Sequence, residues 1–159
     1  MVKASIKGFE LRNITHFLGH EQEDCYQGFI YYKGKKVGYY SDDSWGGQAI
    51  IDFFNEGIDK VFNQNAKEYL KERYPKDTLM HDYTDMFFTD ILQLISIHND
   101  LINDKKEGFQ FIAILSQDGA WCSERAVSFV NEQGLKKYIL ENNLIVEKIF
   151  REDADFIID

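Results

Sequence analysis

The hydrophobic pattern of this chain changes its period twice, and that change constrains the fold more than any other feature of the sequence. Before residue 50, apolar and polar side chains alternate approximately, a pattern typical of β-strands. From residue 50 to residue 104, apolar side chains recur every three or four positions, which is typical of amphipathic helices. Strand patterns then return on either side of one more helical segment. We therefore expect strands and helices in separate blocks, without regular alternation.

The first block predicts an extended strand and a hairpin. Residues 3–18 alternate imperfectly and predict a strand with a bulge near Gly8. The segments CYQGFIYY and VGYYSD are rich in strand-forming residues and flank the short turn KGKK, which predicts a β-hairpin. On its first arm, Phe29 and Tyr31 lie on the face opposite to Ile30. Such a two-sided aromatic strand is either covered on both faces or carries a binding surface on one.

The second block predicts two helices. The three- and four-residue spacing begins at Ile50 and predicts a helix with Asp52 in its first turn, where the helix dipole favours a carboxylate, and with its end at Pro75. A second helix is predicted over residues 85–104. Its apolar face consists of Phe87, Ile91, Leu94, Ile95, His98, Leu101 and Ile102.

The last block completes the fold class. Residues 108–116 are almost continuously apolar and predict a buried central strand, with residues 120–130 as its antiparallel partner. Residues 131–143 predict a helix capped by Asn131, and residues 144–152 predict a closing strand. This order predicts an α+β fold: a mostly antiparallel sheet with about three helices packed on one face. With 159 residues and no linker, we expect a single α+β domain over residues 1–159.

The charge of the chain points to its partners. The formal net charge is −9, divided as +2 over residues 1–40, −7 over residues 41–110 and −4 over residues 111–159. A field of this sign repels phosphate backbones, so we expect no direct nucleic-acid binding and favour a protein partner with a basic surface. Solubility alone would also account for the acidity. No apolar run reaches the roughly 18 residues of a membrane span, and residues 1–13 lack the long apolar stretch of a secretory signal, so we expect a cytoplasmic protein with no membrane partner.

The sequence offers no cofactor motif and only weak candidates for a nucleophile. Cys25 and Cys122 lack the C-x-x-C spacing of zinc or redox sites, and we expect two reduced thiols in a cytoplasm, although one bridge between them stays open. Cys122 fits a small buried hydrophobe better than a reactive thiol. No phosphate-binding glycine loop and no nucleophile elbow occur. We therefore predict no cofactor.

Histidines lie near carboxylates at three places. The densest cluster contains His16, His20, Glu21 and Glu23, and it is the basis for a metal-dependent hydrolase as an alternative function. On a strand the two histidines share a face but lie roughly 13 Å apart, so a solvated strand end explains the cluster better. His98 lies on the apolar helix face, which indicates a core histidine. The third place is the pair His81 and Asp82.

The stretch YYSDDSWGG follows the hairpin directly. Asp42 and Asp43 end the strand and turn the chain into solvent, and they would repel an anion at the glycines that follow. Trp45 either folds back as a lid on the core or offers an amphipathic anchor to a partner.

Two segments of the first block resemble a known family. The segments ITHFLGHEQE and IYYKGKKVGYYSDDSWGG are similar to type II-A anti-CRISPR proteins of the staphylococcal group, which are Cas9 inhibitors carried on mobile elements. The resemblance covers roughly residues 10–47 and includes no catalytic motif. It implies a non-enzymatic inhibitor that binds the Cas9–guide RNA complex in the host bacterial cytoplasm, at the HNH nuclease domain or in the DNA channel, and prevents cleavage of target DNA.

If the resemblance holds, we expect the partner to contact two groups of residues. These are Asp42, Asp43 and Trp45 in the loop, and Asp82 and Asp85 between the two helices. Two alternatives stay open: a small acidic adaptor or immunity protein that dimerises through its edge strands, and the metal-dependent hydrolase.

Overall fold

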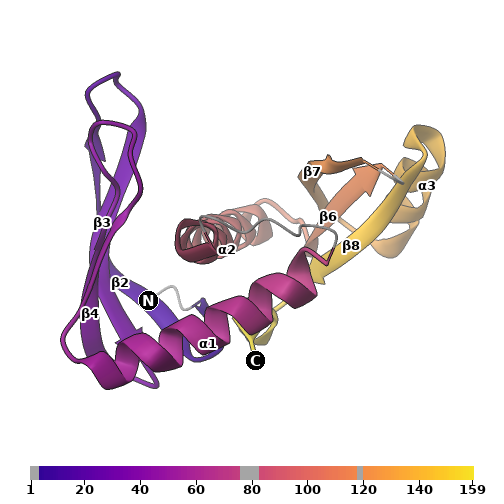
Figure 1. Cartoon of the computed structure of the whole chain (residues 1–159). Helices are drawn as coiled ribbons and strands as arrows, with labels where there is room; N and C mark the ends of the chain where they lie inside the picture. Colours follow the sequence, from indigo (N-terminus) through magenta and orange to yellow (C-terminus); the bar gives the residue numbers. More distant parts are fainter. Residues whose placement is uncertain (1–3, 76–82, 118–119) are drawn as a thin grey trace. The chain divides into compact units, whose positions relative to one another are not determined.

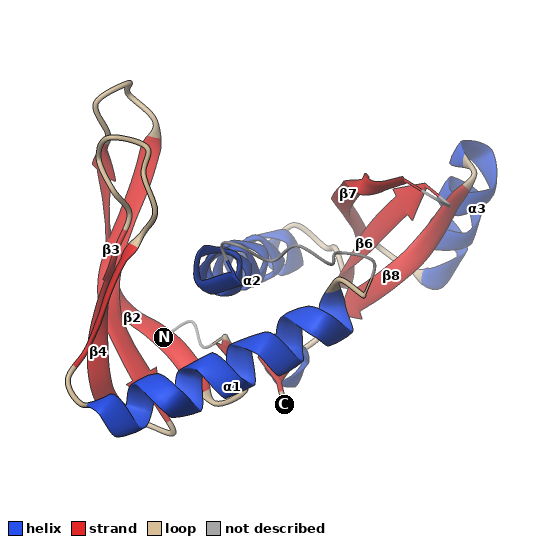
Figure 2. Cartoon of the chain, in the orientation of Figure 1, coloured by secondary structure: helices blue, strands red, loops and turns tan. Residues whose placement is uncertain are grey.

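A computed structural model describes residues 4–75, 83–117 and 120–159, and it confirms the α+β class (Figures 1 and 2). Helices and strands occur in the expected blocks. The elements are β1 (Ser5–Ile6), β2 (Phe9–Leu18), β3 (Asp24–Tyr32), β4 (Lys35–Ser41), β5 (Ile50–Phe53), α1 (Glu56–Arg73), α2 (Tyr83–Lys106), β6 (Phe111–Gln117), β7 (Ala120–Phe129), α3 (Glu132–Asn142), β8 (Leu144–Phe150), the 3-10 turn η1 (Asp153–Phe156) and β9 (Ile157–Ile158).

The strands form two sheets where the sequence predicted one. The first sheet has the order β5-β4-β3-β2-β1-β9, and the second has the order β7-β6-β8. The chain likewise divides into two compact units, one of residues 4–93 with 158–159 and one of residues 94–157. The single-domain organisation therefore stays a prediction.

Two tight turns shape the first sheet. Lys7 and Gly8 both have positive φ, 52° and 80°, as do Lys33 and Gly34, 47° and 81°. Positive φ at both central residues is the geometry of the two-residue turns that favour β-hairpins. The predicted strand over residues 3–18 is therefore wrong at Gly8, where the chain reverses direction. The irregularity in the ladder lies further on, between Arg12 and Thr15.

The first helix begins later than its pattern predicted. Residues 50–53 pair antiparallel with β4 as strand β5, so Asp52 lies in a strand and not in a first helical turn. The helix starts after Asn55, whose side chain accepts a hydrogen bond from the Ile58 N–H at 2.9 Å. This is the usual interaction of a helix N-cap. The predicted end is confirmed, because α1 stops at Arg73, just before Pro75.

An aromatic core holds α1 and the start of α2 on one face of the first sheet (Figure 1). At its centre is Phe62 of α1, whose ring centroid lies between 5.1 and 5.3 Å from four other ring centroids. These rings, which together with Phe62 we call the aromatic core, are Phe9, Phe53, Phe87 and Phe88. None of the described helices is long and apolar enough to cross a membrane.

The second unit matches its predictions closely. Six of the seven residues of β6 are buried, and β7 pairs with it antiparallel, as expected for a central strand and its neighbour. Helix α3 starts after Asn131, whose side chain accepts a hydrogen bond from the Gly134 N–H at 2.9 Å. Leu135 of α3 packs on one face of this sheet, against Phe111 and Leu115.

Candidate partner-binding site

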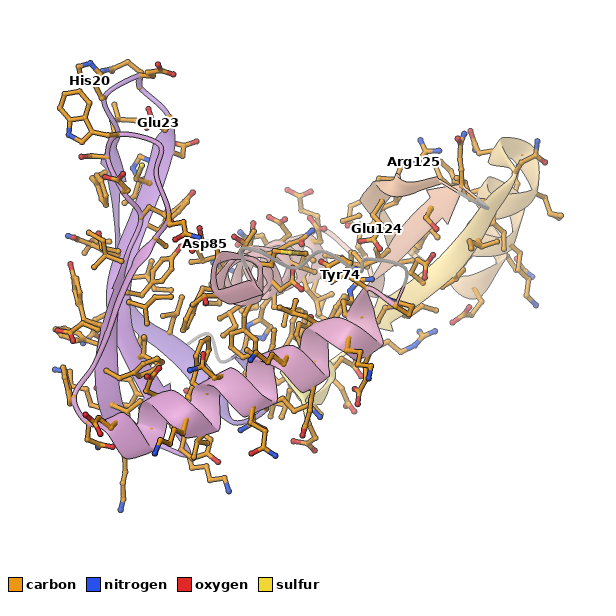
Figure 3. All side chains as sticks on the ribbon, viewed as in Figure 1. His20, Glu23, Tyr74, Asp85, Glu124 and Arg125 are labelled. Atoms are coloured by element: carbon orange, nitrogen blue, oxygen red, sulfur yellow. The ribbon has the colours of Figure 1, made fainter. Side chains whose placement is uncertain are left out.

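The loop of the predicted site meets the β2–β3 turn. The N–H of His20 donates to the carbonyl oxygen of Ser44 at 2.6 Å, and the imidazole of His20 stacks on the indole of Trp45 at 4.0 Å between centroids. We call this assembly, residues 18–24 with residues 42–49, the tip. Figure 3 shows His20 and Glu23 together at this end of the hairpin. Two segments that are distant in the sequence therefore form one surface.

Trp45 is the most prominent apolar side chain of the tip. It is 73% exposed, and Leu18 at the end of β2 is 53% exposed. The interpretation of Trp45 as a lid on the core is therefore wrong. An indole held by a neighbouring ring and open to solvent has the character of an interface anchor.

Asp43 closes the turn that carries Trp45. Its carboxylate accepts hydrogen bonds from the N–H of Trp45 at 3.3 Å and from that of Gly47 at 2.9 Å. A Cβ at position 47 would lie 2.4 Å from this carboxylate, so any other residue there would have to displace the Asp43 side chain from the turn. Because the Gly47 N–H bonds to the chain's own carboxylate, it does not act as a donor to an anion. This agrees with the expectation that the loop repels anions.

Asp42 fixes the base of the loop. Its carboxylate accepts hydrogen bonds from the backbone N–H of Tyr26, at 2.8 Å, and from the hydroxyl of Tyr40. Tyr40 is 2% exposed, and burial, followed by this hydrogen bond, raises the pKa of its hydroxyl. Asp42 therefore has a structural role whether or not a partner contacts it.

The two helix residues of the predicted site have different outcomes. Asp85 of α2 accepts hydrogen bonds from the N–H of Ala49, with 3.2 Å to each carboxylate oxygen, and so ties the end of the loop to the helix (Figure 3). Asp82 lies outside the described residues. The role of all five predicted residues in partner binding stays a prediction.

The β2–β3 side of the tip carries exposed acidic side chains. Glu21 is exposed, and the Glu21 N–H donates to the carboxylate of Glu23 at 2.8 Å. Asp24 is exposed and lies 2.6 Å from Nε2 of His16. The tip therefore combines an exposed indole with several carboxylates.

The residues of the hydrolase alternative do not converge on one point. His16 pairs with Asp24, whereas His20 stacks on Trp45. Across the described ranges, no group of three His, Cys, Asp or Glu side chains is placed to hold a metal ion. The cluster in the sequence is thus explained by two separate local interactions.

The remaining histidine and cysteine candidates lie mostly in the interior. His98 is 3% exposed, which confirms the core histidine, and its Nε2 lies 2.8 Å from Asp153, whose pKa this hydrogen bond lowers. Cys25 is a free buried thiol, and burial raises its pKa, which disfavours the reactive thiolate. His81 and the side chain of Cys122 lie outside the described part of the chain.

Sequence reasoning missed the contribution of the β2–β3 turn to this site. The sequence pattern offers His20 only as a metal ligand, yet in the structure its ring stacks on Trp45 and its N–H donates to Ser44. No local pattern contains this pairing, because it depends on how two loops meet.

No family model matches the chain, and comparisons with curated proteins and with solved structures also give no match.

Proposed function

We propose that this protein is a non-enzymatic inhibitor that binds a basic protein surface, and that its partner is the Cas9–guide RNA complex of a bacterial host. The supporting observation is the tip, where Trp45 is 73% exposed on a loop held by hydrogen bonds at both ends. An exposed indole that already stacks on a neighbouring ring has less conformational freedom to lose on binding, as expected for a residue that dominates an interface.

The charge of the tip suits such a partner. Glu21 and Asp24 are exposed residues of the tip, and the whole chain carries −9. RNA-guided nucleases hold nucleic acid in positively charged channels, so an acidic protein is attracted to the surfaces that the nucleic acid would occupy. Binding at the HNH domain would prevent cleavage and leave DNA binding intact. Binding at the PAM-reading surface would prevent both. The proposed site of action is the bacterial cytoplasm.

The test is a target-DNA cleavage assay with a staphylococcal Cas9–guide complex and excess protein, with a gel shift of the same DNA in parallel. We expect cleavage to stop. Retained DNA binding would indicate the HNH domain, and lost DNA binding would indicate the DNA channel. Full cleavage at large excess, together with a mass that rises with concentration, would contradict the proposal and favour the adaptor.

The variants that identify the contact surface follow from the geometry. Lysine at position 42 or 43 would weaken inhibition but would also remove hydrogen bonds of the loop. Trp45→Ala and Glu21→Lys change exposed side chains of the tip, and we expect each to weaken inhibition with the fold intact. The matched control is Leu140→Ala, because Leu140 is 78% exposed on α3. Equal potency of the tip variants and the control would remove the tip from the proposal.

A further inference from the structure

The first sheet has a second aromatic face, opposite to the one that α1 and α2 cover. Phe29 and Tyr31 occupy alternate positions of the central strand β3, and Tyr39 of β4 lies directly across from Phe29. All three are partly exposed. The rings of the aromatic core contact the other face. We call the side chains of Glu10, Arg12, Gln27, Phe29, Tyr31, Lys36 and Tyr39 the outer face.

Two cations lie on the rings of the outer face. The guanidinium of Arg12 lies 4.3 Å from the centroid of Tyr31, and Nζ of Lys36 lies 3.5 Å from the centroid of Phe29. Each is within the range of a cation–π interaction. Arg12 also bonds to Glu10 at 2.9 Å, which orients its guanidinium.

The rings themselves are held in place. Phe29 and Tyr39 make an edge contact at 5.8 Å, and the Tyr39 hydroxyl donates to Gln27 at 2.7 Å. The outer face is therefore an ordered row of rings and not a set of independent surface side chains. Burying apolar area does not require this row, because the core of the unit lies on the opposite face of the sheet.

The end of the sheet next to these rings is basic. Lys33 and Lys35 are exposed in and beside the β3–β4 turn, and Lys36 follows them. Lys7 lies in the neighbouring turn, which is joined to this one because the Lys33 N–H donates to the Gly8 carbonyl oxygen at 2.9 Å. The exposed carboxylate of Asp52 lies across from Tyr39. Glu10 lies across from Tyr31 and pairs with Arg12, so the two cations on the outer-face rings are matched by two carboxylates. The excess of positive charge lies in the lysines of the two turns, in contrast to the net charge of −9 for the chain.

We propose that the outer face binds single-stranded nucleic acid. Aromatic rings on an open antiparallel sheet stack with unpaired bases, and nearby cations contact the phosphates. The planar guanidinium of Arg12 covers Tyr31 and offers its own plane to a base, since arginine planes also stack with bases. A base that stacks on the same side of Phe29 has to displace the Lys36 ammonium, which is then available to a phosphate. The Lys33 ammonium lies 5.3 Å from the centroid of Tyr32, so it has to leave that ring to contact a phosphate.

Other occupants fit the outer face less well. A duplex does not present its bases to a flat row of rings, because they are paired and stacked internally. An acidic peptide would pair with the lysines, but its carboxylates would not stack on the rings at the alternate positions of β3. The proposal departs from the expectation that the whole chain avoids nucleic acid. That expectation came from the net charge, whereas this inference concerns one locally basic surface.

The test is fluorescence anisotropy of short labelled oligouridine RNA and oligothymidine DNA, about ten nucleotides long, with the full chain at low salt. We expect a Kd in the micromolar range that weakens as salt rises, because bound phosphates release counterions. Comparison of the two oligonucleotides reports whether the 2′-hydroxyl contributes. Absence of binding at about 100 μM protein, well into the non-specific range, would overturn the proposal.

Matched variants separate stacking from charge. Phe29→Leu with Tyr31→Leu keeps apolar packing and removes the rings, and we expect affinity to fall at least about tenfold. Lys33→Glu with Lys36→Glu should abolish binding, whereas Lys137→Glu, an exposed lysine of α3, should have no effect. Wild-type affinity for the leucine variant, or equal displacement of RNA by a polyglutamate peptide, would overturn the stacking interface. This inference is independent of the proposed nuclease inhibition, because the binding assays contain no nuclease.

Discussion

The aromatic core and the tip belong to the same unit, and each is organised around one aromatic side chain. Phe62 is 1% exposed and contacts four other phenylalanine rings. Trp45 is 73% exposed and stacks on the imidazole of His20. The Phe62 ring is enclosed by four packed rings, whereas the Trp45 ring has one stacked neighbour and is carried by a loop whose backbone is hydrogen-bonded.

The difference shows how a small protein keeps an apolar side chain ordered without burying it. In the aromatic core, order comes from burial and close packing of rings. In the tip, order comes from carboxylates that accept backbone hydrogen bonds: Asp42 from Tyr26, Asp43 from Gly47, and Asp85 from Ala49. The loop is therefore ordered without burial of Trp45, and the indole stays available for a partner.

The largest expected effect comes from removing the centre of the aromatic core. Phe62→Ala should lower the free energy of unfolding by about 3–5 kcal/mol, because it leaves a cavity among four rings. Urea denaturation followed by circular dichroism measures the change. Phe54→Ala is the matched control, since Phe54 is 58% exposed and its truncation should change stability by no more than about 0.5 kcal/mol. Equal losses for the two variants would contradict the position of the core.

The second expected effect concerns the base of the loop. Asp42→Ala should cost about 1–3 kcal/mol, because it leaves the Tyr26 N–H and the buried Tyr40 hydroxyl without their acceptor. Tyr40→Phe in the same background should cost less than it does in the wild type, since the two residues share one hydrogen bond. Asp52→Ala, at an exposed carboxylate of β5, is the control. Strictly additive losses would show that the hydrogen bond contributes nothing.

Features that depend on local chemistry were predictable from the sequence. The start of α3 follows from Asn131, and the central position of β6 follows from its apolar run. The start of α1 was not predictable from periodicity, because Phe53 and Phe54 fit both a strand and a helix. Pairing with β4 and the N-cap at Asn55 decide between them.

Features that depend on distant contacts could not be read from the sequence. The division into two units has no linker sequence to indicate it, because the boundary between the units, at Leu94, falls inside helix α2. The stacking of His20 on Trp45 joins two loops that have no shared pattern. The acidic loop was expected as a partner-binding surface, which stays a prediction, and the structural roles of Asp42 and Asp85 became visible only with their backbone partners.

The contact of His98 with Asp153, in the other unit, joins one buried side chain to one exposed side chain. The imidazole is buried against Phe156, whereas the carboxylate is 90% exposed. The hydrogen bond from His98 lowers the pKa of Asp153 from 3.8, so its stabilising contribution is present above that pH and is lost as the pH falls through the lowered value. We expect Asp153→Asn to reduce stability at neutral pH and to flatten the dependence of stability on pH below about 4. Urea midpoints measured from neutral pH to below pH 4 give this dependence. Parallel plots of midpoint against pH for the variant and the wild type would contradict the interaction.

The smallest expected effect on stability is at the tip itself. Trp45→Ala should change the free energy of unfolding by no more than about 0.5 kcal/mol, because the indole is mostly in water in the folded state as well as in the unfolded state. The substitution mainly removes the stacking of the indole on His20. Hydrogen exchange at the His20 amide, which donates to Ser44, should stay slow because that bond does not involve the indole. A large loss of stability would mean that Trp45 is buried in solution, and the separation of order from burial that distinguishes the tip from the aromatic core would fail.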